Sequence, residues 1–309
     1  MKQQYFPYTF FKDKVVKTES ANVPIMTNAL QYGTGVFAGI RGYYNKEGGF
    51  ISLFRIADHY ERFLNSLKII DVNLKYNRNE LVNITLNLVK KNKPKTDTYI
   101  RPFAYAGSTN LSPNLERDKD FDFALYMMPL GDYLPTNKGL SSMVSSWRRV
   151  SDNAIPSRAK ISGSYINSAL ARKEATERGF DEAILLTEDG HVAEGSAENL
   201  FIVRNGTLIT PSQSDDILEG ITRRTIIKIT SDLNIPVEIR TIDRTELYIS
   251  DEAFYCGTGV QVAWIGKIDN RTVGTGKRGP ITQKVQDLFF NIVRGNEKKY
   301  KNWCTKISV

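Results

Sequence analysis

The spacing of apolar residues predicts a chain in which strands and amphipathic helices alternate. Apolar residues recur three or four positions apart in five segments, which predicts helices at 57–70, 79–91, 165–178 and 280–293, and one that opens within 217–224 and runs to about 233. Alternating or continuous apolar runs predict strands at 8–17 (a strand or a hairpin), 36–44, 50–55, 98–105, 121–129, 142–150, 182–187, 200–203 and 252–256. This mixture is typical of α/β and α+β proteins.

The length of the chain suggests two domains. Its 309 residues are about twice the roughly 150 residues of an average domain. The segment 131–138, between two predicted strands, contains Gly, Pro and polar residues. We therefore expect this segment to link the two domains.

Charge and composition exclude several classes of function. The net charge is +8, but the lysines are scattered and form no basic stripe with aromatic residues, so we expect no nucleic-acid partner. Two histidines and two distant cysteines give no metal-binding spacing. We find no signal peptide, and no run approaches the roughly 18 apolar residues of a membrane span, so we expect a soluble, cytoplasmic protein.

One lysine lies in an unusual setting. Lys160 stands between a predicted strand and a predicted helix, among small residues, and Tyr165 follows five positions later. Small neighbours leave room beside the amine for a large flat group, and a desolvated lysine can form a Schiff base with a carbonyl. On this stretch alone, the simpler interpretation is a solvated lysine in a loop.

Two carboxylates and two turns offer further candidates. Glu194 and Glu198 flank a Gly-Ser-Ala bend before an apolar strand, where one of them could pair with a protonated ring nitrogen, or both could be exposed. The helix start at 217–224 and the turn at 257–259 each offer backbone amides and a threonine hydroxyl to an anion. Arg62, beside the apolar stripe of its helix, could point inward or lie at the boundary.

Two groups of residues could bind a substrate. Tyr32, Phe37 and Arg41 could line an apolar cavity with the arginine at its mouth, or could be ordinary sheet packing. Alternate residues of a strand share a face, so Tyr99 and Arg101 point to the same side. Such a pair would suit a carboxylate next to an apolar pocket.

Taken together, these segments resemble the fold-type IV pyridoxal-phosphate enzymes, and most closely the branched-chain amino-acid aminotransferases. The resemblance extends from about Asn28 to Gly295. It rests on the motifs Tyr32-Gly-Thr-Gly-Val-Phe-Ala-Gly-Ile-Arg41, Tyr99-Ile-Arg-Pro102, Lys160 with Tyr165, Glu194-Gly-Ser-Ala-Glu-Asn-Leu-Phe201, Leu218-Glu-Gly-Ile-Thr-Arg223 and Gly257-Thr-Gly259. Each motif is weak alone, but their order and spacing are specific and replace the interpretation of Lys160 as a solvated loop residue.

The resemblance implies a fold and a reaction. The fold combines a small N-terminal α+β domain (1–132), a linker (133–140) and a larger C-terminal α/β domain (141–309), with pyridoxal 5′-phosphate at their interface. The family forms homodimers or assemblies of dimers. The implied reaction is transamination between L-leucine, L-isoleucine or L-valine and 2-oxoglutarate, which gives the branched 2-oxo acid and L-glutamate.

The resemblance also implies roles for individual residues. Lys160 would bind the cofactor covalently and carry the proton at the substrate's Cα, Tyr165 would bond the cofactor's phenolic oxygen, and Glu194 would keep its ring nitrogen protonated. Further cofactor-binding residues would be Arg62, Leu218, Gly220, Ile221, Thr222 and Thr258. Substrate-binding residues would be Tyr32, Phe37, Gly39, Arg41, Tyr99, Arg101, Tyr133, Thr258, Gly259 and Val260. Of these, Tyr99 and the amides of 259 and 260 would take the α-carboxylate, and Arg101 the side-chain carboxylate of 2-oxoglutarate.

Three departures from the family pattern affect the expected substrate range. Ala38 stands where many relatives have glutamate, Leu130 where some have an aromatic residue, and Gly259-Val260-Gln261 where some have Ala-Ala-Glu. An aminotransferase with an altered substrate range is therefore an alternative.

Rival functions exist both on the same fold and outside it. A D-amino-acid aminotransferase typically has a histidine where this chain has Phe103, and the Tyr-Ile-Arg-Pro strand argues against an aminodeoxychorismate lyase. A binding protein without catalysis would be expected to have lost Lys160, and the joint spacing of the motifs argues against a purely structural protein.

Overall fold

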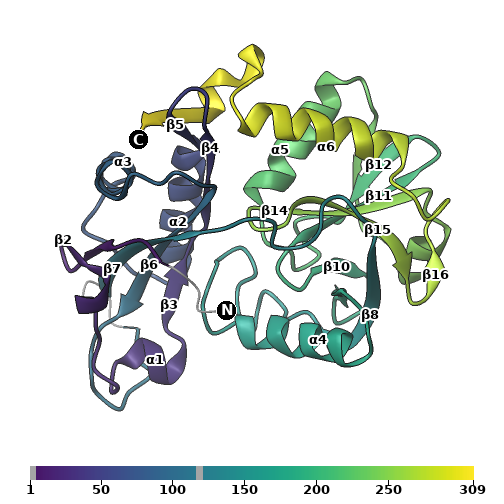
Figure 1. Cartoon of the computed structure of the whole chain (residues 1–309). Helices are drawn as coiled ribbons and strands as arrows, with labels where there is room; N and C mark the ends of the chain where they lie inside the picture. Colours follow the sequence, from purple (N-terminus) through teal and green to yellow (C-terminus); the bar gives the residue numbers. More distant parts are fainter. Residues whose placement is uncertain (1–4, 116–120) are drawn as a thin grey trace. The chain divides into compact units, whose positions relative to one another are not determined.

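The computed structural model describes residues 5–115 and 121–309 (Figure 1). Contacts divide the chain into two compact units. The first unit consists of Met1–Gly131, Ala159–Gly163 and Asn291–Val309, and the second of Asp132–Arg158 and Ser164–Phe290. The predicted mixture of α/β and α+β structure is confirmed. The predicted domain boundaries, 1–132 and 141–309, stay a prediction. The contacts show in addition that two later segments, Ala159–Gly163 and Asn291–Val309, pack with the first unit.

The first unit is built on an antiparallel sheet of eight strands, in the order β17-β5-β4-β6-β7-β1-β2 with β3 beside β6. The strands are β1 (Tyr8–Phe11), β2 (Lys14–Lys17), β3 (Gly35–Phe37), β4 (Ile40–Asn45), β5 (Phe50–Phe54), β6 (Thr98–Ala106), β7 (Phe121–Pro129) and β17 (Cys304–Ser308). Its helices are α1 (Asn28–Tyr32), α2 (Ile56–Ile69) and α3 (Arg78–Asn92), with short 3₁₀ helices η1 (Thr18–Ser20) and η3 (Lys298–Trp303).

The apolar stripes of α2 and α3 explain how the first unit is held together. Tyr60 and Phe63 of α2 and Leu88 of α3 are buried in one cluster with Ile51 and Ile100 of the sheet. The apolar spacing that predicted both helices therefore marks the faces that they bury.

The second unit is built on a mixed sheet of nine strands, in the order β10-β9-β8-β15-β14-β11-β12-β13 with β16 beside β15. The strands are β8 (Leu140–Arg148), β9 (Glu182–Leu186), β10 (Val192–Gly195), β11 (Asn199–Arg204), β12 (Thr207–Thr210), β13 (Val237–Ile239), β14 (Glu252–Gly257), β15 (Gln261–Ile268) and β16 (Arg271–Thr272). Its helices are α4 (Tyr165–Glu177), α5 (Ile221–Asp232), most of α6 (Pro280–Val293) and the 3₁₀ helix η2 (Arg244–Ile249).

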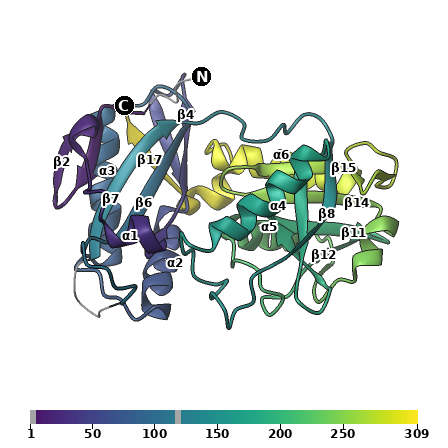
Figure 2. The same ribbon diagram turned by 90° about the horizontal axis from the view of Figure 1, so that it is seen from below.

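The helices of the second unit cover both faces of its sheet. Figure 1 shows α4 on one face and α5 and α6 on the other, and Figure 2 shows the same elements from below. None of the described helices is long and apolar enough to cross a membrane.

The structure corrects one predicted strand. The run 36–44 forms two strands, β3 and β4, instead of one. The strand is interrupted at Ala38 and Gly39, where the Ala38 N–H donates to the Pro102 carbonyl (3.0 Å). A Cβ on Gly39 would lie 1.9 Å from the Tyr99 hydroxyl oxygen, so this tyrosine can occupy its place only beside a glycine.

Candidate active site

In the first unit, Lys160 belongs to a segment that is fastened to β3. The Phe37 N–H donates to the Lys160 carbonyl (3.0 Å), and the Ser162 N–H donates to the Gly35 carbonyl (2.8 Å). A Cβ on Gly33 would lie 2.8 Å from the Cα of Gly163, which shows how closely the two segments approach. Lys160 therefore has a backbone fixed on both sides, unlike a lysine in a solvated loop.

The side chain of Lys160 faces an aromatic wall. Its Nζ lies 5.1 Å from the centre of the Phe37 ring, and the residue is half-buried. The backbone N–H of Lys160 donates to the Ser66 hydroxyl (3.2 Å), which in turn donates to the Arg62 carbonyl one helical turn earlier (2.9 Å). Arg62 is half-buried, and its backbone is thus joined to the lysine segment through Ser66.

A group of side chains in the first sheet consists of Tyr99, Arg101 and Phe37, with Gly39 beside the tyrosine. The Arg101 guanidinium lies 4.4 Å from the centre of the Phe37 ring and donates to the Tyr99 hydroxyl (3.2 Å). Its Nε is buried without a hydrogen-bond partner in the described structure. Such a guanidinium, packed on aromatic rings with a donor still to be satisfied, suits a carboxylate ligand.

The other two candidates of the first unit lie in different surroundings. Arg41 is only 2% exposed, and its Nη2 donates to the carbonyls of Leu130 (3.3 Å) and Gly131 (2.7 Å). It therefore holds the chain after β7, and its place in a substrate pocket stays a prediction. Tyr32 ends α1 and is exposed.

In the second unit, Glu194 is the centre of a buried polar network. Its Oε1 pairs with Nη2 of Arg149 (3.0 Å), and its Oε2 accepts from the Asn199 amide (2.9 Å) and the Leu218 N–H (3.2 Å). The arginine favours the ionised form of the carboxylate, and the other bonds fix its orientation. Sequence reasoning missed Arg149 and Asn199 as functional residues, although Asn199 lies within the motif that runs from Glu194 to Phe201.

Glu198, the other candidate carboxylate, has a different environment. Its Oε2 accepts from the Ala197 N–H (2.8 Å), and its carbonyl accepts from the Gly195 N–H (2.7 Å). Burial, together with the negative charge of Glu182, raises the pKa of Glu198 and so favours its neutral form. Of the two carboxylates, Glu194 is the one suited to keep a ring nitrogen protonated.

The first turn of α5 has the features of an anion site. Gly220 is its N-cap residue, and no side chain caps the helix start there. A Cβ on Gly220 would lie 2.0 Å from the Asn199 carboxamide oxygen, so the helix start and the Glu194 network fit together only through a glycine. Ile221 and Thr222 are buried and begin the helix. The uncapped amides and the helix dipole suit a phosphate.

The turn between β14 and β15 carries the remaining candidates. Thr258 and Gly259 are half-buried at the turn, whereas the side chain of Val260 is buried in the core of the second unit. A Cβ on Gly259 would lie 3.8 Å from Tyr133, which shows that the tyrosine packs beside this turn. Tyr165, the first residue of α4, is partly buried.

The structure thus gathers the candidates within each unit. The first unit brings together Lys160, Phe37, Gly39, Tyr99, Arg101 and Arg62, and the second unit brings together Glu194, Leu218, Gly220, Ile221 and Thr222. Taken by itself, the first unit provides an amine and a carboxylate site, and the second provides a ring-nitrogen partner and a phosphate cradle. Each set fits a different part of pyridoxal phosphate and an amino acid.

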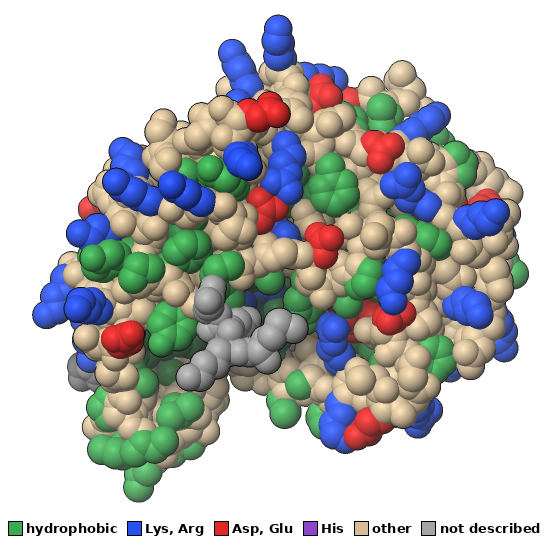
Figure 3. All heavy atoms as spheres, viewed as in Figure 1, with side chains coloured by type: hydrophobic (Ala, Val, Ile, Leu, Met, Phe, Trp, Pro, Cys, Tyr) green, Lys and Arg blue, Asp and Glu red, His purple; other side chains and the backbone are tan. Residues whose placement is uncertain are grey.

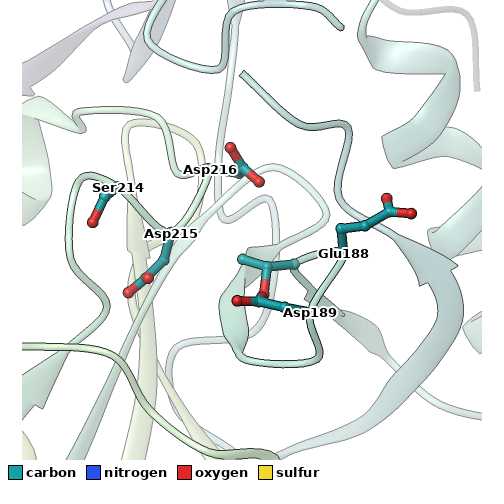
Figure 4. A pocket seen from close by; sticks show the side chains of 6 residues that line it. Glu188, Asp189, Ser214, Asp215 and Asp216 are labelled. Atoms are coloured by element: carbon teal, nitrogen blue, oxygen red, sulfur yellow. The ribbon is translucent and has the colours of Figure 1, made fainter. Parts of the chain in front are cut away.

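A separate pocket of the second unit does not fit these ligands. Figure 4 shows its lining, formed by Thr187, Glu188, Asp189, Ser214, Asp215 and Asp216. Four carboxylates would repel a phosphate or a substrate carboxylate. Several of them already fix the backbone, as where Asp216 accepts from the Asp152 N–H (2.9 Å). Among the residues that the structure describes, no group of His, Cys, Asp and Glu is arranged to hold a metal ion.

The sequence profile of the family described as Amino-transferase class IV matches residues 35–268 of the chain. The protein therefore belongs to the class IV aminotransferases, as the predicted resemblance implied. Its relatives point to one group within this class, the branched-chain-amino-acid aminotransferases. A probable branched-chain-amino-acid aminotransferase of Aquifex aeolicus is 46% identical over 97% of this chain and 96% of its own length. The branched-chain-amino-acid aminotransferase of Escherichia coli K12 is 35% identical over 97% of both chains.

Solved structures agree with these relatives. The branched-chain aminotransferase of Thermoproteus uzoniensis with norvaline superposes with a TM-score of 0.93 at 43% identity and covers 98% of this chain and 99% of its own. The branched-chain amino acid aminotransferase of Thermobaculum terrenum in its PLP-form has a TM-score of 0.94 at 36% identity and covers 99% of this chain and 100% of its own.

Proposed function

We propose that the protein is a pyridoxal-phosphate-dependent branched-chain aminotransferase of the cytoplasm. It transfers the amino group of L-leucine, L-isoleucine or L-valine to 2-oxoglutarate and yields branched 2-oxo acids and L-glutamate. The observation that carries the proposal is the fixed, half-buried Lys160 near Phe37, with Arg101 on the same ring, in a chain whose relatives are named for this activity.

Each proposed residue has a distinct task. When bound, pyridoxal phosphate withdraws electrons from the substrate's Cα and makes its proton acidic. The Lys160 amine would bind the cofactor and move that proton. The anchored backbone of Lys160 limits the positions that its Nζ can reach and so would help to orient the amine. Glu194 holds a proton at the ring nitrogen, and Tyr165 bonds the phenolic oxygen. The start of α5, with Thr222, and the residues Arg62 and Thr258 bind the phosphate.

The substrate contacts follow the same division. Tyr99, with the amides of Gly259 and Val260, binds the α-carboxylate, and Phe37 supplies an apolar wall for the branched side chain. Arg101 accepts the second carboxylate of 2-oxoglutarate or glutamate. The buried Nε without a hydrogen-bond partner in the described structure supports this role of Arg101.

The visible absorption spectrum of the purified holoenzyme tests the proposed function in two half-reactions. Adding L-isoleucine without an oxo acid is expected to convert the yellow form to the pyridoxamine form, and 2-oxoglutarate is expected to restore the yellow colour. A protein that ignores L-isoleucine but responds to a D-amino acid would keep the cofactor and exclude this substrate class.

The variant Arg101→Gln is expected to affect the two half-reactions differently. Because only 2-oxoglutarate carries a second carboxylate, we expect its half-reaction to slow by about 10²-fold, the effect of losing one charged hydrogen bond. The half-reaction with L-isoleucine should change by less than about threefold. Arg148→Gln, an exposed arginine in β8, serves as the matched control. Equal losses in both half-reactions would remove the proposed role of Arg101.

An exposed apolar patch supports the homodimer that this proposal includes. Ile25, Leu30 and Leu111 are 76%, 60% and 84% exposed. The Asn28 N–H donates to the Ser108 carbonyl (2.7 Å), so α1 and the 108–112 loop lie side by side. Figure 3 shows hydrophobic side chains gathered on one face of the molecule at this end of the first unit. Apolar patches of this kind mark interfaces.

Sedimentation analysis at micromolar concentration tests the dimer. We expect a mass twice the 35.0 kDa of the chain. The double substitution Leu30→Asp and Leu111→Asp should give monomers, because two charges would be buried in the interface. Ile249→Asp changes an isolated exposed residue (62%) and should leave the dimer intact. If the double variant stays dimeric, the interface lies elsewhere.

A further inference from the structure

The start of the linker is tied to three different elements of the second unit. The donors are amide and guanidinium groups from β15, α4 and α6. The three hydrogen bonds run from Gln261 Nε2 to Asp132 Oδ1 (3.0 Å), from Arg172 Nη1 to the Tyr133 hydroxyl (2.8 Å) and from Gln286 Nε2 to the Thr136 carbonyl (3.0 Å). A connecting segment with this many tertiary bonds is held in one position relative to its own unit.

Arg172 makes the most elaborate of these contacts. Its guanidinium carbon lies 5.1 Å from the centre of the Tyr133 ring, so the arginine both stacks on the ring and bonds its hydroxyl. The same Nη1 pairs with Glu182 Oε2 (3.0 Å). The side chain of Glu182 is fully buried, whereas that of Arg172 is 31% exposed. The arginine therefore connects the buried carboxylate of Glu182 with the half-exposed ring of Tyr133.

The carboxylate of Glu182 is itself held in place by hydrogen bonds. Glu182 accepts hydrogen bonds from the Ala183 N–H (2.8 Å) and from Ser196. Ser196 belongs to the bend that follows Glu194, so the arginine is positioned relative to the proposed ring-nitrogen partner as well. A contact of a planar cation with both a fixed carboxylate and a fixed ring restricts its rotamers strongly.

Tyr133 is placed beside the turn that is proposed to bind the α-carboxylate. Its ring lies next to Gly259, and 47% of the residue is exposed. Gln261, which bonds the preceding residue, adopts a left-handed backbone (φ +64°) and is 2% exposed. Tyr133 is therefore clamped on one side by Arg172 and packed on the turn, while its remaining surface is open to a ligand.

We propose that Arg172 determines the side-chain specificity of the aminotransferase by fixing Tyr133 as a wall beside Gly259. The inference rests on the proposed function, which places the substrate's α-carboxylate at this turn. Arg172 is a positioning residue, since it acts through Tyr133. A preordered wall favours substrates with side chains large enough to contact it, because the wall loses no side-chain entropy when they bind.

The experiment compares Arg172→Met/Glu182→Gln with Glu182→Gln alone. Glutamine replaces Glu182 because that carboxylate would otherwise be buried without a cation and could prevent folding. In the double variant, we expect the KM for L-isoleucine to rise about tenfold, with kcat and the KM for the smaller L-2-aminobutyrate within about twofold. Tyr133→Phe, which keeps the ring and loses only the hydroxyl bond, should give a smaller rise in the same direction.

Hydrogen exchange supplies a readout that does not depend on activity. Amides of residues 132–137 should exchange faster in the double variant than in Glu182→Gln. Arg178→Met, which alters an exposed arginine at the end of α4, should leave both the KM values and the exchange unchanged. Equal KM changes for the two amino acids, or unchanged exchange in 132–137, would overturn the proposal. If instead the wild type fails to react with L-isoleucine while the exchange result is as expected, the proposed function is wrong, but Arg172 still fixes the position of Tyr133.

Discussion

Replacing Lys160 with alanine is expected to lower kcat with L-leucine and 2-oxoglutarate by at least about 10⁴-fold. The amine is proposed both to bind the cofactor and to move the proton at Cα, and each role is worth several orders of magnitude. The fold should be unaffected, because the bonds that fasten this segment to β3 use backbone atoms of Phe37 and Lys160. Steady-state turnover measures the loss, and circular dichroism checks the fold.

The matched control for this prediction is Lys173→Ala. Lys173 is an exposed lysine of α4 that pairs with Glu177 four residues later, so its removal should leave turnover unchanged. Equilibrium dialysis should show that Lys160→Ala still takes up pyridoxal phosphate without covalent attachment, through the residues proposed to hold the phosphate. If the variant kept a turnover above about 10⁻² of the wild-type value, the proposed role of Lys160 would be contradicted.

The variant Glu194→Gln is expected to lower kcat by about 10² to 10³-fold. Glutamine keeps the size of the side chain and can still accept from Asn199, but it cannot hold a positive charge at the ring nitrogen. Substrate KM values should change much less, because Glu194 contacts the cofactor in this proposal and not the amino acid. An unchanged rate would mean that another residue faces the ring nitrogen.

Stability and rate can be separated in this experiment. Glu194→Gln leaves Arg149 in a buried position without its carboxylate, which should lower the free energy of unfolding by about 3 kcal/mol. The double variant Arg149→Met/Glu194→Gln removes the buried charge and should recover much of that stability, as urea unfolding can show. Its rate should stay low. If the rate recovered together with stability, Glu194 would have a structural role only. Glu188→Gln, which changes an exposed glutamate nearby in the sequence, is the control.

Local patterns predicted the five longer α-helices of the described residues and most strands well, but not the short helix α1, because the information for the longer elements lies in neighbouring residues. The α2 stripe repeats every three to four positions, and the hairpin of β1 and β2 turns at Lys12 and Asp13, which have positive φ values of 45° and 71°. The turn at Asn205 and Gly206, a residue pair typical of hairpins, joins β11 to β12. These features depend on local chemistry alone.

The missed features depend on distant partners. The strand Cys304–Ser308 is short and mixed in polarity, and it forms because it pairs with β5, whose residues lie far earlier in the chain. Similarly, only the folded structure brings Arg149, at the end of β8, to Glu194. The family resemblance already assigned Glu194 to the ring nitrogen, but the local sequence offered no physical reason to prefer it over Glu198. That reason comes from the fold, which places a cation beside one carboxylate and buries the other.

The place of β17 in the first sheet has a consequence for synthesis of the protein on the ribosome. Cys304 pairs with Phe54, and the lysine segment at 159–163 also belongs to the first unit. A nascent chain that ends at residue 131 therefore lacks both, and leaves the edge of β5 open to wrong pairing. We expect the first unit to close only after translation has passed residue 308. The second unit, whose segments end at Phe290, can form earlier, although it begins later in the sequence.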